Sequence, residues 1–309
     1  MKLKFFTIVS ILTATTLLLS CNDNLDVAPR NSIGSDQSLN TSADVEALLK
    51  GGYDALADGD LYGGNLLRDA ELLGDGGEIF WDGTFVDPGE IWSKSILITN
   101  GQVENTWLSA YKAINICNTV LANLDLVTPD RKDRVEGEAK FIRGTLYFEL
   151  VRMYARTWSD GSPAANPGVP LITEPTTEQT ATAKVNRSTV AQVYAQVIAD
   201  LTEAETKLPE ENGFYATTYA ASGMLSRVYL AQQDFAQARD AADRVIESGA
   251  YELARTYADA FNKGSLEGSN ASIEDVFAIQ VTSQDGVNNM NTFFASSDFG
   301  GRGDIYIDP

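Results

Sequence analysis

The sequence predicts an all-α protein, an α/α superhelix of paired helices with long irregular loops and little β-structure. Apolar residues recur every three or four positions in several segments of the 309-residue chain, which is the spacing of helices with one buried face. Short or medium connections join these segments, as in proteins built from helix pairs. Residues 57–101 and 283–309 lack this spacing and are rich in glycine and aromatic residues, so we interpret them as long structured loops.

Residues 1–20 have the features of a bacterial lipoprotein signal peptide. Two lysines precede the uncharged run 5–19, which is too short to span a bilayer comfortably. Ser20 offers signal peptidase a small residue, and Cys21 offers a thiol for acylation. We therefore expect Cys21 to become a lipid-anchored N-terminus, with residues 21–40 as its polar tether. An ordinary signal peptide followed by a coincidental cysteine is the alternative.

Residues 41–309 are expected to form the helical domain. Its first helix begins at Thr41, where Asp44 completes a capping pair, and Pro129, Pro209 and Gly249 mark helix ends. Ser188 is expected to cap a later helix. Apolar periodicity places helices at about 45–56, 107–124, 135–153, 190–208, 220–229 and 235–246, with a short helix near 66–73 and a strand at 276–281.

The two helices expected at 220–229 and 235–246 have the spacing of one tetratricopeptide unit. Leu225, Tyr229 and Ala238 flank the short turn of sequence QQDF. In such a unit, small residues let two antiparallel helices approach closely while the tyrosine lies between them. This pattern favours tetratricopeptide-like helical pairs for the domain as a whole.

The composition excludes several kinds of function. The chain has 23 lysines and arginines against 43 acidic residues, and its formal net charge of −20 repels nucleic-acid phosphates. It has no histidine, which removes Ser-His-Asp and Cys-His catalysis and the commonest zinc ligand. Cys117 lies on an apolar helix face, so we expect a core residue rather than a nucleophile. We expect no cofactor, although calcium bound by loop carboxylates is left open.

Several segments, taken in order, resemble the SusD/RagB family of outer-membrane nutrient-binding lipoproteins of the Bacteroidetes. The helix containing 137–144 and 147–152 is close to the most recognisable helix of that family. The other matching segments are 21–29, Trp107 with Tyr111 and 114–118, 168–171, and 221–251. Members of the family usually continue well beyond the length of this chain, so we expect a fragment or a truncated product.

The resemblance implies a function and a partner. Such proteins lie on the cell surface, cap a TonB-dependent (SusC-like) outer-membrane transporter, and deliver captured oligosaccharides or sometimes peptides to it without cleaving them. The tetratricopeptide-like helices would face the transporter, and irregular loops on another face would hold the ligand.

The loops contain the residue types that bind sugars. Exposed aromatic rings stack on the apolar faces of sugars, while amides and charged groups bind the hydroxyls. The alternative is that these aromatic residues only pack the loops onto the helical core. The predicted binding residues are Trp81, Trp92, Phe85 and Tyr62 as stacking rings, Asp82, Asn65, Arg68 and Asp75 as hydroxyl partners, and Asn288, Phe293 and Phe299 in the later loop.

Two other functions remain open at this point. A tetratricopeptide scaffold lipoprotein would bind only proteins, and it would be indifferent to replacement of Trp81 or Trp92. A glycosidase would need two carboxylates flanking the bond that it cleaves, and no pair is marked by its sequence context.

Overall fold

The computed structural model describes residues 39–74, 76–176, 184–260, 272–279 and 289–307. The chain divides into two compact units, Met1–Asn40 and Thr41–Pro309. Only residues 39 and 40 of the first unit are described, so the account below concerns the second unit. Among the described residues, no helix is both long enough and apolar enough to cross a membrane.

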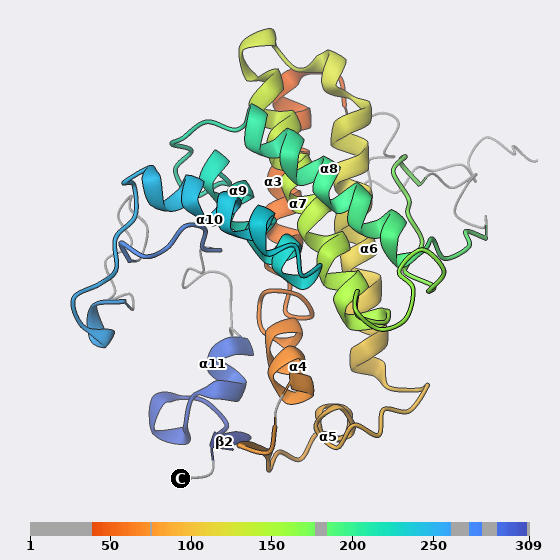
Figure 1. The fold of residues 1–309 in the computed structure, drawn as a ribbon, viewed down its shortest axis with the longest axis vertical. Helices are drawn as coiled ribbons and strands as arrows, with labels where there is room; N and C mark the ends of the chain where they lie inside the picture. The colour runs from red at the N-terminus through yellow and green to blue at the C-terminus, as the bar shows by residue number, and fades with distance from the viewer. Residues whose placement is uncertain (1–38, 75, 177–183, 261–271, 280–288, 308–309) are drawn as a thin grey trace, which may run out of the picture. The chain divides into compact units, whose positions relative to one another are not determined.

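Most of the second unit is a bundle in which helices pack on their neighbours in the chain (Figure 1). Helix α7 packs on α6 and α8, α8 packs on α9, and α9 pairs with α10. Helix α3 packs on α6 and α7. The bounds are Ser42–Leu56 (α3), Gly101–Ala122 (α6), Pro129–Tyr154 (α7), Val190–Lys207 (α8), Thr218–Ala231 (α9) and Phe235–Glu247 (α10), with 3-10 turns at Leu124–Leu126 and Tyr257–Ala260. This arrangement confirms the all-α prediction.

Helix α7 is the centre of the bundle because it is buried on most of its sides, as its sequence predicts. It can approach α8 closely at Gly144, where an added Cβ would lie 3.1 Å from Leu201 Cγ. Capping boxes at Thr41 and Thr189 satisfy backbone N–H groups at the starts of α3 and α8. Cys117 is a fully buried free thiol whose pKa is raised to about 12 by burial, so it is a core residue.

A second group of elements, here called the loop lobe, is built from two segments far apart in the sequence (Figure 1). The first segment forms α4 (Asn65–Gly74), β1 (Ile79–Trp81) and α5 (Val86–Trp92). The second forms α11 (Asn289–Phe294), the 3-10 turn Ser297–Phe299, and β2 (Ile305–Ile307). Strands β1 and β2 pair antiparallel with Phe80 opposite Tyr306, and α11 packs on α4. The two predicted loop regions therefore fold together into one small structure.

Hydrogen bonds, of which two are partly buried, hold the loop lobe and the segment before it on the bundle. The Tyr62 hydroxyl donates to Glu149 of α7 at 2.7 Å, and the Thr106 hydroxyl of α6 donates to the carbonyl of Asp60 at 3.0 Å. The backbone N–H of Asn289 donates to the carbonyl of Gly63 at 3.1 Å. These bonds hold the segment before α4 against α6 and α7, and they hold the start of α11 next to the start of α4.

Three details differ from the sequence prediction. Residues 276–279 form bends and irregular backbone, so the strand predicted over 276–281 is wrong for its described part. Pro129 is the first residue of α7, where its missing N–H has no cost, and α6 already ends at Ala122. The cap of α8 is Thr189 rather than Ser188.

Candidate ligand site in the loop lobe

The pairing of β1 with β2 decides which aromatic rings of the loop lobe point inward. Side chains alternate along a strand, so Trp81 lies on one face of the ribbon and Phe80 on the other. Trp81 is 8% exposed and packs in a cluster with Leu72, Ile91 and Phe293. Its ring centroid lies 6.0 Å from that of Phe293. This cluster is the hydrophobic core of the loop lobe.

The opposite face of the ribbon carries a second set of rings. Phe80 stacks on Tyr306 with their centroids 5.3 Å apart and an interplanar angle of 13°. Trp92 lies 6.1 Å from Phe80, and its indole N–H donates to the carbonyl of Ile79 at 2.8 Å. Tyr306 is 48% exposed, so this stack presents one aromatic ring to solvent.

A third feature combines an aromatic ring with charged groups. Phe85 is 49% exposed, and the guanidinium carbon of Arg302 lies 4.6 Å from the centre of its ring. The Nε atom of Arg302 donates to Asp304 at 2.6 Å, and its Nη2 atom donates to Thr84 Oγ1 at 3.2 Å. An open ring thus lies beside a fixed cation, which is the combination of apolar face and hydrogen-bond donors that polyhydroxylated ligands need.

A buried ion pair on α4 contacts the aromatic core of the loop lobe at Phe293. Arg68 Nε donates to Asp69 Oδ1 at 2.8 Å, and both side chains are almost wholly buried. The Arg68 guanidinium carbon lies 4.3 Å from the centre of the Phe293 ring. Burial raises the pKa of Asp69 to about 6, although the charge of Arg68 acts in the opposite direction.

The predicted binding residues therefore occupy different environments. Trp81, Phe293, Asn65 and Arg68 are buried, which agrees with the alternative that they hold the loops together. Trp92 and Tyr62 are half-buried, while Phe85, Asp82 and Phe299 are exposed. Asp75 and Asn288 lie outside the described residues. The ligand-binding role of all these residues stays a prediction.

The sequence reasoning did not single out Tyr306, Arg302 and Asp304 as site residues. Their neighbours in the structure lie in β1 and the loop that follows it, more than 200 positions earlier in the sequence. No local pattern therefore marks these three residues, and the only signal was the aromatic and glycine-rich composition after residue 283. Within the described ranges, no three histidine, cysteine, aspartate or glutamate side chains come together to hold a metal ion.

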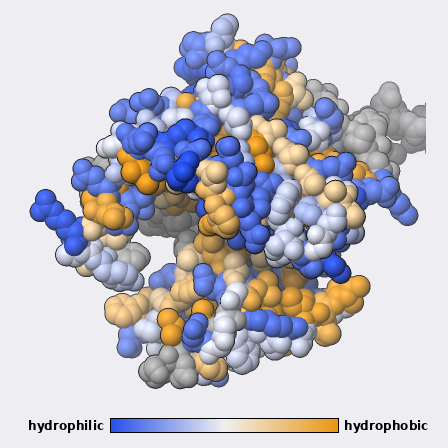
Figure 2. All heavy atoms as spheres, viewed as in Figure 1, coloured by the Kyte–Doolittle hydropathy of each residue, from blue (hydrophilic) through white to orange (hydrophobic). Residues whose placement is uncertain are grey.

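Apolar residues gather around the loop lobe and its connection to α6 on the face shown in Figure 2. Ile96, Leu97 and Ile98, in the segment between α5 and α6, are exposed apolar residues. The fold and this site define an all-α protein of packed helix pairs that carries an aromatic lobe.

Solved structures share this fold. A putative sugar binding protein from Bacteroides vulgatus superposes with a TM-score of 0.74 and 26% identity, covering 87% of this chain and 61% of that one. A SusD-like carbohydrate binding protein from the same species gives a TM-score of 0.66 and 26% identity, covering 77% and 50%. A laminarin binding SusD-like protein, with a TM-score of 0.61, 23% identity and coverage of 72% and 48%, is similar in fold.

The sequence itself assigns the family. The SusD-like family described as "starch-binding associating with outer membrane" matches residues 24–230, and the chain belongs to this family. The SusD-like protein P2 of Formosa agariphila is 26% identical over 307 residues, which cover 98% of this chain and 57% of that relative. The chain thus spans less than two thirds of the length of these relatives.

Proposed function

We propose that the chain captures oligosaccharides at the outer surface of the outer membrane, anchored through Cys21, and passes them uncleaved to a TonB-dependent transporter. The proposal that the chain binds oligosaccharides rests on the structure of the loop lobe. Two segments from opposite ends of the domain meet there. They leave Phe85, Phe299 and Tyr306 exposed to solvent, with exposed fractions of 49%, 80% and 48%. Arg302 and Asp304 lie beside the first of these rings.

The names of two relatives support carbohydrate as the ligand class. The solved structures titled sugar binding and carbohydrate binding are each 26% identical to this chain. An exposed ring offers a sugar its apolar contact, while Arg302 donates hydrogen bonds to hydroxyls and Asp82 accepts them. We therefore place the binding residues of the proposal at Phe85, Asp82 and Phe299.

Binding without cleavage agrees with the pairing of the buried carboxylates. A glycosidase uses two carboxyl groups on opposite sides of one bond. Asp69 and Asp304 of the loop lobe are each paired with an arginine, although the charges of Asp60 and Asp87 also act on Asp69.

Contact with a protein partner is supported by the helix pair α9 and α10. Leu230 and Ile246 are large apolar residues that stay exposed on these two helices. We propose this helix pair as the surface that meets the transporter.

The ligand proposal is tested with native gels cast with starch, laminarin and other neutral polysaccharides. Purified residues 22–309 contain the whole compact unit Thr41–Pro309. We expect retardation in at least one gel, and we expect the double variant Phe85→Ala/Phe299→Ala to abolish it. Tyr257→Ala, which removes an exposed ring outside the loop lobe, is the matched control and should migrate as the parent does.

Two results would contradict the proposal. Retardation that survives the double variant would move the site away from the exposed rings of the loop lobe. Release of reducing sugar by the purified chain would show catalysis and would favour the glycosidase alternative.

A further inference from the structure

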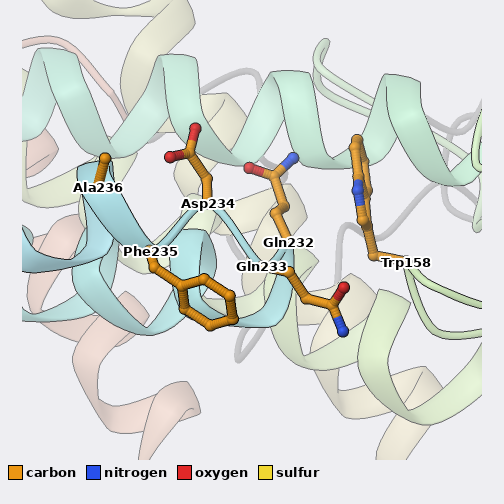
Figure 3. Close-up of a pocket in the computed structure, with 6 residues that line it drawn as sticks. All are labelled: Trp158, Gln232, Gln233, Asp234, Phe235 and Ala236. Atoms are coloured by element: carbon orange, nitrogen blue, oxygen red, sulfur yellow. The ribbon is translucent and has the colours of Figure 1, made fainter.

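An open hollow lies in the bundle, at the turn between α9 and α10. It has a volume of about 680 Å³ and is lined by Trp158, Gln232, Gln233, Asp234, Phe235 and Ala236 (Figure 3). A volume of this size lies within the range that small-molecule sites occupy. None of these residues belongs to the loop lobe, and the hollow lies at one end of the helix pair that is proposed above to meet the transporter.

The indole of Trp158 forms one wall of the hollow. Trp158 follows the end of α7 and packs against Tyr194 of α8, with ring centroids 5.1 Å apart and an angle of 64° between the planes. In Figure 3 the indole is seen edge-on, so that one of its faces is turned toward Gln232. A large aromatic face is therefore held in place at the edge of an open space.

The turn opposite this wall has an unusual backbone for its sequence. The N–H of Asp234 donates to the carbonyl of Tyr229 at 2.9 Å, and the N–H of Gln233 donates to the carbonyl of Leu230 at 3.0 Å. This is the Schellman pattern, which places Gln233 in the left-handed region at φ 62°, where glycine is usual. A side chain at this position costs about 1 kcal/mol of stability, yet the turn carries a glutamine.

The amides of the turn are available to a ligand. The structure gives Gln232 and Gln233 no side-chain hydrogen bond to any described residue, and Gln233 is exposed. Each amide can donate and accept, as adjacent sugar hydroxyls require. Asp234 accepts from the N–H of Gln237 at 3.2 Å as the cap of α10. Its negative charge opposes an anionic ligand at the same place.

We propose that this hollow is a second carbohydrate site, in which one neutral sugar unit stacks on Trp158 while Gln232 and Gln233 bind its hydroxyls. The inference takes its ligand class from the proposed function but uses different residues on a different part of the domain. A chain with two separate sites would hold a long glycan at two points and gain avidity without any new contact.

The turn offers a variant that tests the side chains without harming the fold. Gln233→Gly removes one amide and leaves the left-handed backbone to the residue that prefers it, so the stability of the turn should not fall. Combined with Gln232→Ala, it removes both amides. Gln237→Ala, on α10 but outside the hollow, is the matched control.

Calorimetric titration of residues 22–309 with maltohexaose and with laminarihexaose is the experiment. We expect two sites, of which the Gln232→Ala/Gln233→Gly variant weakens one by about tenfold or more. Trp158→Ala, checked by circular dichroism for its helix content, should weaken the same site. Phe85→Ala/Phe299→Ala should leave this site intact.

The outcomes separate this inference from the proposed function. Binding that only the loop-lobe variant reduces would overturn the second site and leave the proposed function standing. Binding that only the turn variants reduce would support the hollow and contradict the loop lobe. No binding of either sugar would overturn both, and binding of peptides in place of sugars through the same glutamines would overturn the ligand class.

Discussion

The ion pair between Arg143 of α7 and Asp200 of α8 should be costly to break. Arg143 donates from Nε to Asp200 Oδ2 at 2.8 Å and from Nη2 to Oδ1 at 2.7 Å, a two-pronged contact. Its Nη1 atom donates to Asn118 of α6 at 2.9 Å, so one side chain joins three helices. The side chains of the pair are only 7% and 3% exposed.

The expected magnitude follows from this burial. Asp200→Asn keeps the shape of the side chain but leaves the Arg143 charge buried without a counterion, which costs about 3–5 kcal/mol of unfolding free energy. The double variant Arg143→Met/Asp200→Asn leaves no buried charge. It should lose only about 1–3 kcal/mol, for the polar groups that remain unpaired. The double variant is therefore expected to be more stable than Asp200→Asn alone.

Urea unfolding followed by far-ultraviolet circular dichroism gives these free energies. The control is Lys132→Met, which breaks an ion pair with Asp125 whose side chains are 40% and 101% exposed and should cost about 1 kcal/mol or less. The reasoning is refuted if Asp200→Asn loses no more stability than Lys132→Met. It is also refuted if the stability losses of Arg143→Met and of Asp200→Asn, measured separately, simply add in the double variant.

Three further predictions concern the loop lobe and its attachment. Burial raises the pKa of Asp69 above its value in the unfolded chain, so the folded state favours the protonated carboxyl. The stability that protonated Asp69 contributes is complete below pH about 4 and is lost as the pH rises through about 6. Amide hydrogen exchange in the loop lobe, corrected for intrinsic rates, should therefore speed up over that range in the parent but not in Asp69→Asn. Tyr62→Phe leaves the buried Glu149 carboxylate one donor short and should cost about 1–3 kcal/mol in urea unfolding. Gly83→Ala places a Cβ 2.4 Å from the Trp81 ring, so it should shift tryptophan emission to longer wavelength and cost about 1–3 kcal/mol.

Each of these has a simple contrary result. Equal pH dependence in parent and Asp69→Asn would mean that this carboxylate does not govern the loop lobe. Unchanged stability of Tyr62→Phe would mean that water replaces the hydroxyl. For Gly83→Ala the control is Gly76→Ala, whose added Cβ has open space around it, and equal emission from the two variants would contradict the packing argument.

The helices of the bundle could be predicted because each carries its own local signal. Thr41 and Asp44 form the expected capping box, and the apolar face of α7 is buried as its spacing requires. The turn between α9 and α10 also lies where the small residues and the QQDF sequence place it. Among these helices the errors lie at the ends. Ser188 and Thr189 are both good capping residues, and Gln192 completes a capping box with Thr189.

The loop lobe could not be predicted in detail, because its elements are short and depend on distant partners. Strands β1 and β2 have three residues each, and α11 has six, so no periodicity marks them. Composition indicated that both loop segments are aromatic. Which ring points outward is decided by the pairing of Phe80 with Tyr306, and this pairing buries Trp81 while Phe85 stays exposed.

That same pairing sets an order in which the contacts of the domain form during folding. Helices α3, α6 and α7 can pack together before the segment from residue 289 onward joins them, since their contacts lie within the first half of the chain. The Asn289 side chain meets Gly59, 230 positions earlier, so the loop lobe closes last. Until then the aromatic strand Ile79–Trp81 has no partner edge. An unpaired aromatic strand edge can pair with another chain, so the partly folded protein is most prone to aggregation before the loop lobe closes.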